Sequence, residues 1–298
     1  MSLASFCPPS SPAHHLLRFL ASKHPAASAC YNRLRDDEFL SYRVLKAVLG
    51  DELPVPEEQL PGLLGPLQPR YYSACRAQTE MPDKRSFQFC FNVSRQWRDG
   101  ACVFEGLASA WLERQILAGS SAGSRAVTFP VVKRESQLHF RLPASLTPVQ
   151  PIIMIAAGTG VAPFVGFLDQ LRAAGDQAPF CWLVFGCRQV ESDFIFRPEI
   201  VAAQPKPLSR LDLAVSQPEA GAEKEKEYVQ DVLRRESDRL FQLLMVEGAR
   251  VYVCGDELGM IKGVNEVICE LLIRKGVVGS EREAMQLLQQ RIIRDIWI

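Results

Sequence analysis

The second half of the chain alternates short apolar runs with longer amphipathic stretches. Apolar runs typical of buried strands occupy residues 152–156, 181–185, 211–215, 250–254 and 292–297. Between them apolar residues recur at helical spacing, as Val161, Phe164 and Leu168 do, and Ser280 with Glu283 predicts a capping-box start for the last helix. Strands that alternate with helices favour parallel βαβ units. The sequence therefore predicts an α/β domain with a doubly wound parallel sheet over residues 148–298.

The first predicted strand runs directly into a glycine-rich turn. Gly158-Thr159-Gly160 follows it, and Pro163 suits the first turn of a following helix. Glycines let backbone amides approach a phosphate closely, and a helix N-terminus adds favourable partial charge. An ordinary glycine turn in an α/β domain would have the same sequence, so the motif by itself leaves both interpretations open.

Polar and reactive residues also follow other predicted strands. Arg188 follows the second strand, Cys254 and Asp256 end the fourth, and Asp295 lies in the last. Parallel sheets bind ligands at the carboxyl ends of their strands. The sequence therefore predicts a ligand site at this edge of the sheet, where Arg188 would meet a pyrophosphate.

Residues 1–147 show other patterns. Residues 1–68 combine short helical patterns with a proline-rich connector. Residues 86–93 alternate with period two, and a helix is predicted to start near Leu107. We therefore expect a partial antiparallel barrel at 69–147, preceded by a helical segment.

Composition excludes several classes of function. The chain carries 34 basic and 34 acidic side chains, and this balance lacks the basic surface of a nucleic-acid-binding protein. No histidine stands at metal-ligand spacing from a cysteine, so we expect no metal site. Nine cysteines without a CxxC pair indicate reduced thiols and a cytoplasmic location. Cys90 and Cys181 lie in apolar runs and are interpreted as small buried hydrophobic residues.

The longest apolar run does not predict a membrane segment. It covers residues 151–168 and is interrupted by Gly158-Thr159-Gly160. A membrane span would not usually place such a loop signal at its centre. We therefore expect no membrane segment in this chain.

The motifs occur in an order that resembles the diflavin reductase family. In chain order they are Arg70-Tyr71-Tyr72-Ser73, Gly106-Leu107-Ala108-Ser109, residues 158–164, residues 185–188, Tyr228-Val229-Gln230, residues 252–256 and Asp295-Ile296-Trp297. The resemblance runs from about residue 16 to the end of the sequence. Residues 91–93 and 295–297 are most similar to the methionine synthase reductases of that family.

For the flavin, the resemblance implies a site built largely by the middle of the chain. Arg70 would meet the FAD pyrophosphate, Tyr72 would stack on the isoalloxazine ring, and Ser73 would hydrogen-bond near its N5 atom. Trp297 would cover the flavin face. The FAD phosphates would be bound at a helix start by Gly106, Leu107, Ala108 and Ser109. The alternatives are a Tyr72 that only packs and a Trp297 that only plugs the core.

For NADPH, the resemblance implies contacts along the predicted ligand edge. Ser73, Cys254, Asp295 and Trp297 would be the catalytic residues around the nicotinamide. The NADPH-binding residues would be Gly158, Thr159, Gly160, Arg188, Ser216, Gln217, Lys226, Tyr228, Gln230, Cys254 and Asp256.

Three of these NADPH-binding assignments are open to an alternative interpretation or depart from the family pattern. The family typically has Ser-Arg where this chain has Ser216-Gln217, which removes one phosphate-binding cation. Lys226 lies in a run of alternating Glu and Lys that could be only a solvated face. Cys254 could be a core thiol. NADPH is nevertheless expected rather than NADH.

The resemblance implies three domains and one activity. Residues 1–68 would be the remnant of a helical connecting domain, 69–147 a partial FAD-binding barrel, and 148–298 the NADP(H)-binding domain. NADPH would pass hydride to FAD, and electrons would continue to an FMN-containing domain or a protein acceptor such as methionine synthase. The alternatives are an NADPH–cytochrome reductase and a flavin-free NADP(H)-binding or interaction protein descended from such a reductase.

Overall fold

The chain divides into two compact units, Met1–Arg70 and Tyr71–Ile298. The computed structural model describes residues 18, 21–26, 69–76, 88–98, 101–121, 131–132, 140–143, 150–218 and 225–297. The strands of these ranges lie in the second unit. Most of the helical segment predicted at 1–68 lies outside the described residues.

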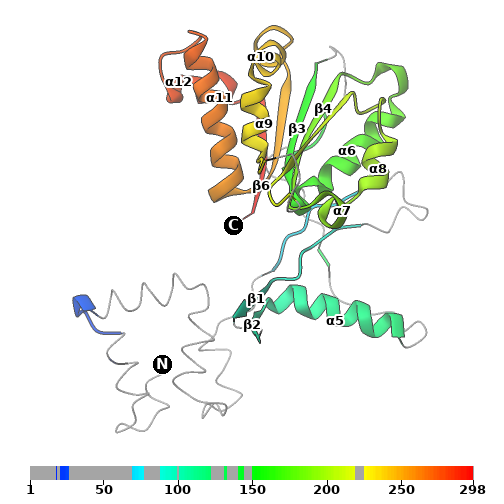
Figure 1. Ribbon diagram of the computed structural model, residues 1–298, viewed down its shortest axis with the longest axis vertical. Helices are drawn as coiled ribbons and strands as arrows, with labels where there is room; N and C mark the ends of the chain where they lie inside the picture. Colours follow the sequence, from blue (N-terminus) through cyan, green and yellow to red (C-terminus); the bar gives the residue numbers. More distant parts are fainter. Residues whose placement is uncertain are drawn as a thin grey trace. The chain divides into compact units, whose positions relative to one another are not determined.

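The second unit contains a five-stranded parallel sheet with the strand order β5-β4-β3-β6-β7 (Figure 1). Its strands are β3 (Ile152–Ala157), β4 (Cys181–Cys187), β5 (Arg210–Val215), β6 (Arg250–Asp256) and β7 (Ile292–Trp297). The chain adds β4 and β5 on one side of β3, then returns to add β6 and β7 on the other. The five predicted strands and the doubly wound sheet are therefore confirmed.

Helices cover both faces of this sheet (Figure 1). One face packs against α6 (Ala162–Ala173) and α8 (Arg197–Ala202), with the short α7 (Val190–Asp193) between β4 and α8 in the chain. The other face packs against α9 (Val229–Arg235), α10 (Ser237–Phe241), α11 (Lys262–Arg274) and α12 (Glu281–Leu288). Single helical turns are η4 (Gly158–Val161), η5 (Gly175–Gln177), η6 (Gln242–Val246) and η7 (Glu257–Ile261). No helix in the described ranges is long and apolar enough to cross a membrane.

Helix α12 begins at the predicted capping box. The Ser280 hydroxyl accepts a hydrogen bond of 3.3 Å from the backbone amide of Glu283. The Glu283 carboxylate in turn accepts one of 2.8 Å from the amide of Gly279. The side chains of Ser280 and Glu283 therefore accept hydrogen bonds from two backbone amides, those of Glu283 and Gly279, that have no acceptor within the helix.

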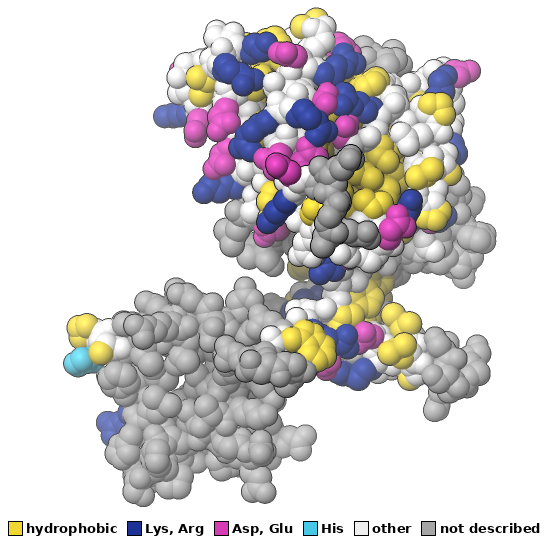
Figure 2. Space-filling view, in the orientation of Figure 1, with side chains coloured by type: hydrophobic (Ala, Val, Ile, Leu, Met, Phe, Trp, Pro, Cys, Tyr) yellow, Lys and Arg dark blue, Asp and Glu magenta, His cyan; other side chains and the backbone are white. Residues whose placement is uncertain are grey.

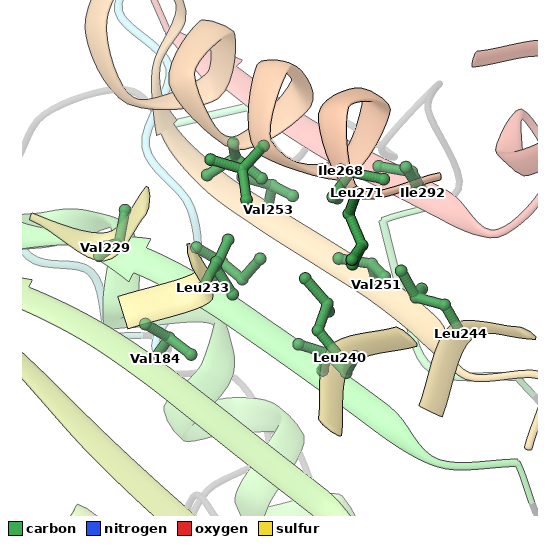
Figure 3. Packing of buried hydrophobic residues seen from close by; sticks show 14 of the residues in the cluster. Val184, Val229, Leu233, Leu240, Leu244, Val251, Val253, Ile268, Leu271 and Ile292 are labelled. Atoms are coloured by element: carbon green, nitrogen blue, oxygen red, sulfur yellow. The ribbon is translucent and has the colours of Figure 1, made fainter. Parts of the chain in front are cut away.

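The parallel sheet is buried on both faces. Successive side chains of a strand point to opposite faces, so Ile153 and Ile155 join the cluster beneath α9–α12, and Ile152 and Met154 join the cluster beneath α6 and α8. All four are at most 1% exposed. In Figure 3, Val251 and Val253 of β6 lie next to helix α11 within the first of these clusters. Burial contributes about 1.5–3 kcal/mol for each such aliphatic side chain.

The cluster beneath α6 extends upstream of residue 148. The Phe140 ring lies 5.6 Å from the Phe167 ring and 5.6 Å from the Tyr252 ring, and Leu142 is buried in the same cluster. The Tyr252 hydroxyl donates a hydrogen bond of 3.0 Å to the carbonyl of Arg141. The core of the α/β body therefore includes residues that lie before the predicted domain boundary at 148.

A hairpin and a helix form the earlier part of the second unit. Strands β1 (Arg95–Arg98) and β2 (Ala101–Glu105) pair antiparallel, and α5 (Leu107–Ser121) follows, which confirms a helix starting at Leu107. The continuous strand expected at 86–93 is wrong for the described residues 88–93, which contain a single bridge between Phe89 and Ala74. The regular ladder of β1 and β2 begins at Arg95, and the Gly106 amide continues it by donating to the carbonyl of Ser94. The rest of the predicted barrel lies outside the described residues.

Acidic and basic side chains intermingle over the helices that follow β5, in the view of Figure 2. Many of them form ion pairs, such as Arg239 with Glu247 at 2.7 Å and Lys275 with Asp238 at 2.7 Å. Solvent-exposed pairs of this kind contribute about 0–1 kcal/mol each. The two apolar clusters, rather than these ion pairs, therefore provide most of the stability.

Candidate functional site

The carboxyl ends of β3, β6 and β7 bring several predicted site residues to one edge of the sheet. In register, Ala156 of β3 pairs with Cys254 of β6, and Cys254 pairs with Asp295 of β7. The connections that follow β3 and β6 lead to opposite sides of the sheet. Doubly wound sheets open a ligand crevice at such a switch point.

The glycine turn lies at this switch point. Gly158 has a φ angle of +52°, which favours glycine, and no heavy atom lies within 4 Å of the place where a Cβ atom would stand. The turn continues as η4 into α6, with Pro163 in the first turn as predicted. An open backbone turn beside a helix N-terminus suits a phosphate group.

Three of the predicted catalytic residues meet at this edge. The Ser73 hydroxyl donates a hydrogen bond of 2.6 Å to Oδ2 of Asp295. The Cys254 thiol donates to the same oxygen over 3.7 Å. Burial, together with the Asp295 carboxylate, raises the pKa of Cys254 well above its ordinary value, so this residue remains a neutral thiol. Within the described ranges, no group of His, Cys, Asp or Glu side chains could hold a metal ion.

Ser73 belongs to a short ladder between residues 73–75 and 88–90. Ala74 bridges Phe89 in antiparallel fashion. Alternation along the paired segments places Ser73, Cys75 and Cys90 on the face opposite to these two residues. That face contacts the sheet edge at two points, since Ser73 donates to Asp295 and the Cys90 thiol donates to the carbonyl of Thr159 over 3.7 Å.

The other face of the ladder is aromatic. The Tyr72 ring lies 4.9 Å from the Phe89 ring and 6.2 Å from the Phe91 ring, and the two phenylalanine rings are 6.0 Å apart. Tyr72 nevertheless remains 39% exposed. The predicted flavin-stacking residue is thus supported by neighbours on one side and presents surface to solvent.

Cys90 is a residue whose place the sequence interpretation missed. Cys181 is fully buried, as expected of a small hydrophobic residue, but Cys90 is half-buried and makes a polar contact at the glycine turn. The interpretation of Cys90 as a buried hydrophobic residue is therefore wrong. The period-two pattern contains the signal, because it puts Cys90 on the face opposite to Phe89 and Phe91.

The start of α5 is tightly packed around Gly106. A Cβ atom on Gly106 would lie 2.7 Å from Oγ of Ser109 and 2.8 Å from Cβ of Ser94. The Gly106 amide donates to the carbonyl of Ser94 at 2.7 Å, and the Ser109 hydroxyl accepts from the Ser94 amide at 3.1 Å. Leu107 is exposed and Ala108 half-buried. These four residues form the predicted helix start, and their contact with FAD phosphates stays a prediction.

Arg188 follows β4 at the same edge as the glycine turn. It is exposed and forms an ion pair of 2.8 Å with Asp193 of α7. This contact raises the pKa of Arg188 and lowers that of Asp193. An exposed pair costs about 0–1 kcal/mol to separate, so Arg188 can exchange this partner for a phosphate.

The residues predicted for the 2′-phosphate gather at the end of β5. The amides of Ser216 and Gln217 donate to the carbonyls of Cys187 and Arg188 at 3.0 and 2.9 Å, which extends the pairing with β4. Glu227, just before Tyr228, donates from its amide to the carbonyl of Val215 at 2.9 Å. The structure therefore brings the segments that carry Gln217 and Tyr228 together.

Lys226 and Tyr228 form a cation–π pair at this position. The Lys226 ammonium lies 4.7 Å from the centre of the Tyr228 ring, and both side chains are exposed. Gln230, two residues on, lies apart from this pair and packs against Gly263 in the first turn of α11. The predicted trio is thus divided between an exposed pair and a half-buried residue.

The remaining predicted residues occupy more structural positions. Asp256 caps η7, because its carboxylate accepts a hydrogen bond of 2.6 Å from the amide of Gly259. Trp297 pairs with Asp256 in the strand register, while its side chain lies outside the described residues. Arg70 is exposed and belongs to the first unit.

This fold and edge geometry define a nucleotide-binding α/β domain. The family model "Oxidoreductase NAD-binding domain" matches residues 154–266, which run from β3 into α11. Among curated relatives, NADPH–cytochrome P450 reductase of Oryctolagus cuniculus is 34% identical over 79% of this chain and 34% of its own length. Methionine synthase reductase of Rattus norvegicus is 32% identical over 94% of this chain and 43% of its own length. The mouse methionine synthase reductase is 31% identical over the same shares.

The chain belongs to the diflavin reductase family. It spans about a third to two fifths of the length of these curated relatives. The resemblance drawn from the motif order is therefore confirmed at the level of the family. The cytochrome P450 reductases and the methionine synthase reductases both match, so the comparisons do not distinguish between these two subfamilies.

Proposed function

We propose that this chain is an NADPH-dependent flavoprotein reductase module. The observation that carries the proposal is the contact of Ser73 and Cys254 with one carboxylate oxygen of Asp295, beside the glycine turn. Three polar groups from different parts of the sequence converge there at the edge where doubly wound sheets bind dinucleotides. When bound, NADPH supplies a hydride that FAD accepts at N5.

The chain's own residues would position these cofactors. The turn at 158–160 would bind the NADPH diphosphate through backbone amides, with Arg188 released from Asp193 as its counter-charge. Tyr72 would contribute an aromatic surface for the flavin ring, since it is partly exposed and supported by Phe89. The helix start at Gly106 would face the FAD phosphates.

Ser73, Asp295 and Cys254 would fix the orientation of the reacting groups. The Ser73 hydroxyl donates its hydrogen bond to Asp295. The lone pairs of the Ser73 oxygen can therefore accept a hydrogen bond from a cofactor. Cys254 remains protonated, so it acts as a neutral contact and not as a nucleophile. The chemistry then belongs to the cofactors, and this group supplies alignment.

The preference for NADPH would depend on the pair of Lys226 and Tyr228. Lys226 is an exposed cation, and the next residue pairs with the end of β5, where the family resemblance implies the 2′-phosphate of NADPH. Gln217 stands where the family has an arginine, so one cation is missing. We expect NADPH to be favoured by a smaller margin than two cations would give.

The electron acceptor would be an FMN-containing domain or a protein. The names of the relatives point to two kinds of acceptor, methionine synthase and cytochrome P450. Residues 91–93 and 295–297 resemble those of methionine synthase reductases, so they favour methionine synthase as the acceptor. A cytoplasmic location is part of the proposal and rests on nine cysteines without the spacing of a disulfide framework.

The proposal is tested by the absorbance spectrum of the purified full chain. After incubation with FAD and removal of unbound flavin, we expect retained flavin absorbance that NADPH bleaches without oxygen. The Asp295→Asn variant should bleach more slowly, and Asp176→Asn, an exposed residue outside the site, should not differ from wild type. A colourless protein that still binds NADPH would instead support the flavin-free alternative.

A further inference from the structure

Cys75 and Cys90 lie side by side on the ladder next to the glycine turn. The Cys75 amide donates to the carbonyl of Gln88 at 2.7 Å, so Cys90 stands diagonally across from Cys75 on the paired segment. Alternation places both side chains on one face, and each thiol perturbs the pKa of the other, as expected of sulfur atoms that lie close together. Diagonal neighbours on a ladder stand farther apart than direct partners, so a disulfide between them requires a small backbone adjustment as well as side-chain rotation.

The two thiols have unequal environments. Cys75 is 1% exposed, whereas Cys90 is half-buried and accessible. Because the Cys75 thiol donates to its sulfur, the pKa of Cys90 is lowered, while the pKa of Cys75 is raised. The thiolate is the reactive form of cysteine. Cys90 is therefore the thiol that reacts first, and Cys75 remains protonated beside it.

Cys254 is not an equivalent partner for Cys90. It is fully buried, and its thiol donates to the Asp295 carboxylate. That carboxylate and the burial keep its proton in place. Cys75, which lies on the same face of the ladder as a diagonal neighbour of Cys90, is the favoured second thiol.

We propose that Cys90 and Cys75 form a reversible dithiol–disulfide pair whose oxidation by a peroxide weakens dinucleotide binding at the neighbouring glycine turn. The Cys90 thiolate attacks hydrogen peroxide and, with one proton taken up, gives a sulfenic acid and water. The Cys75 thiol then displaces the hydroxyl group, which leaves as a second water, and the disulfide closes. A small dithiol reverses the process by exchange, and is itself oxidised to a disulfide.

The consequence for the site follows from one contact. The reduced Cys90 thiol donates to the carbonyl of Thr159 in the glycine turn. The disulfide has no S–H group, so this contact between ladder and turn is lost. A single hydrogen bond contributes about 0.5–1.5 kcal/mol, which corresponds to a loss of dinucleotide affinity of roughly two- to tenfold. This second part of the proposal rests on the proposed NADPH site, whereas disulfide formation does not.

The first experiment identifies the cross-link in the full chain. The protein is treated with hydrogen peroxide, free thiols are alkylated, and peptides are mapped by mass spectrometry without reductant. We expect a peptide pair joined through Cys75 and Cys90, absent from Cys75→Ser and from Cys90→Ser. The matched control is Cys269→Ser, a buried cysteine of α11 whose thiol contacts the carbonyl of Glu281, and it should cross-link like wild type.

The second experiment measures the dissociation constant for NADPH by calorimetry. Oxidised wild type should bind roughly two- to tenfold more weakly than reduced wild type, with full recovery after dithiothreitol. Oxidation should leave the dissociation constant of Cys75→Ser unchanged once dithiothreitol has removed any sulfenic acid.

The two experiments separate the dithiol from the proposed function. A cross-link from Cys90 to Cys254, or over-oxidation of Cys90 without any cross-link, would overturn the dithiol. A Cys75–Cys90 cross-link without any change in NADPH affinity would overturn the effect on the site. If the reduced protein bound no NADPH at all, the proposed function would fail, and the peptide map would still decide whether the pair exists.

Discussion

The Ser73 hydroxyl donates a hydrogen bond of 2.6 Å to the Asp295 carboxylate across 222 positions of sequence. This bond joins the ladder that carries Tyr72 to the last strand of the parallel sheet. Cys254 donates to the same oxygen, so the carboxylate accepts from two donors. One acidic side chain therefore provides one of the two contacts that join the ladder to the sheet edge, and the other is made by Cys90 with Thr159.

Replacement of that acid should impair both stability and reaction. In Asp295→Asn a charged acceptor becomes neutral, and a hydrogen bond to a charged group is worth about 1.5–3 kcal/mol. We expect the free energy of unfolding to fall by about 1–2 kcal/mol in urea, because the pair is only partly buried. Flavin bleaching by NADPH should slow at least tenfold, since alignment is lost as well.

A double-mutant cycle with Ser73→Ala checks the cause. If Ser73 acts through Asp295, the two substitutions together should cost clearly less than the sum of their separate costs. Additive losses in unfolding free energy would show that the 2.6 Å contact contributes nothing of its own.

Cofactor preference should depend on Lys226. The Lys226 side chain is exposed, so a contact of its ammonium with the 2′-phosphate of NADPH would contribute about 1–2 kcal/mol. Lys226→Ala should therefore raise the dissociation constant for NADPH roughly five- to thirtyfold and leave that for NADH nearly unchanged. The control is Lys206→Ala, whose exposed ammonium pairs with Asp176. Equal losses for both cofactors would mean that Lys226 is only a surface charge.

The local pattern of the sequence was enough to predict the α/β body. The central strands β3, β4 and β6 are buried on both faces, so they appear as nearly continuous apolar runs. The glycine turn has the positive φ angle that only glycine adopts readily. Capping at Ser280 also depends on neighbours three residues apart. Interactions between residues so close in the chain can be predicted from the sequence.

Contacts between distant segments could not be predicted in the same way. The packing of Gln230 against α11 depends on tertiary placement. The ion pair of Arg188 with Asp193 and the helix-capping role of Asp256 are local, and they were missed because both residues were assigned to the cofactor. In place of the strand expected at 86–93, the described residues 88–93 form one bridge, whose partner Ala74 lies in another segment. Cys90 was missed because an apolar context was given more weight than the face it occupies.

Phe140 should be part of the stability of the α/β body. It lies before the predicted boundary at 148, yet it is buried against Phe167 and Tyr252. Truncation of a buried phenylalanine costs about 3–5 kcal/mol, so Phe140→Ala should lower the free energy of unfolding by that amount. Val246→Ala, at a position 66% exposed, should change it by less than about 0.5 kcal/mol. A small effect of Phe140→Ala would show that the body is complete without residues 140–142.

Trp297 should act as a gate over the flavin rather than as a core plug. It closes β7, which among the described strands lies at the edge of the sheet and pairs with β6. A residue at the end of an edge strand is held on one side only, so its displacement costs less than that of a residue in a central strand. Aromatic stacking on the isoalloxazine ring would be favoured by area burial and by the ring quadrupoles. Nicotinamide must displace such a ring, and the stacking energy is subtracted from nicotinamide binding.

Removal of the ring should therefore tighten cofactor binding. In flavin-loaded protein, Trp297→Ala should lower the dissociation constant for NADH by roughly three- to tenfold, from an aromatic pair worth about 0.5–1.5 kcal/mol. NADPH should gain proportionally less, because its phosphate already anchors it. Release of oxidised cofactor should slow, and turnover should fall if release is limiting. Trp297→Phe, which keeps a ring, should stay close to wild type. If Trp297→Ala left both affinities unchanged and lowered the melting temperature by several degrees, Trp297 would be a structural plug. A side chain that only packs in the core stabilises the fold and does not compete with nicotinamide.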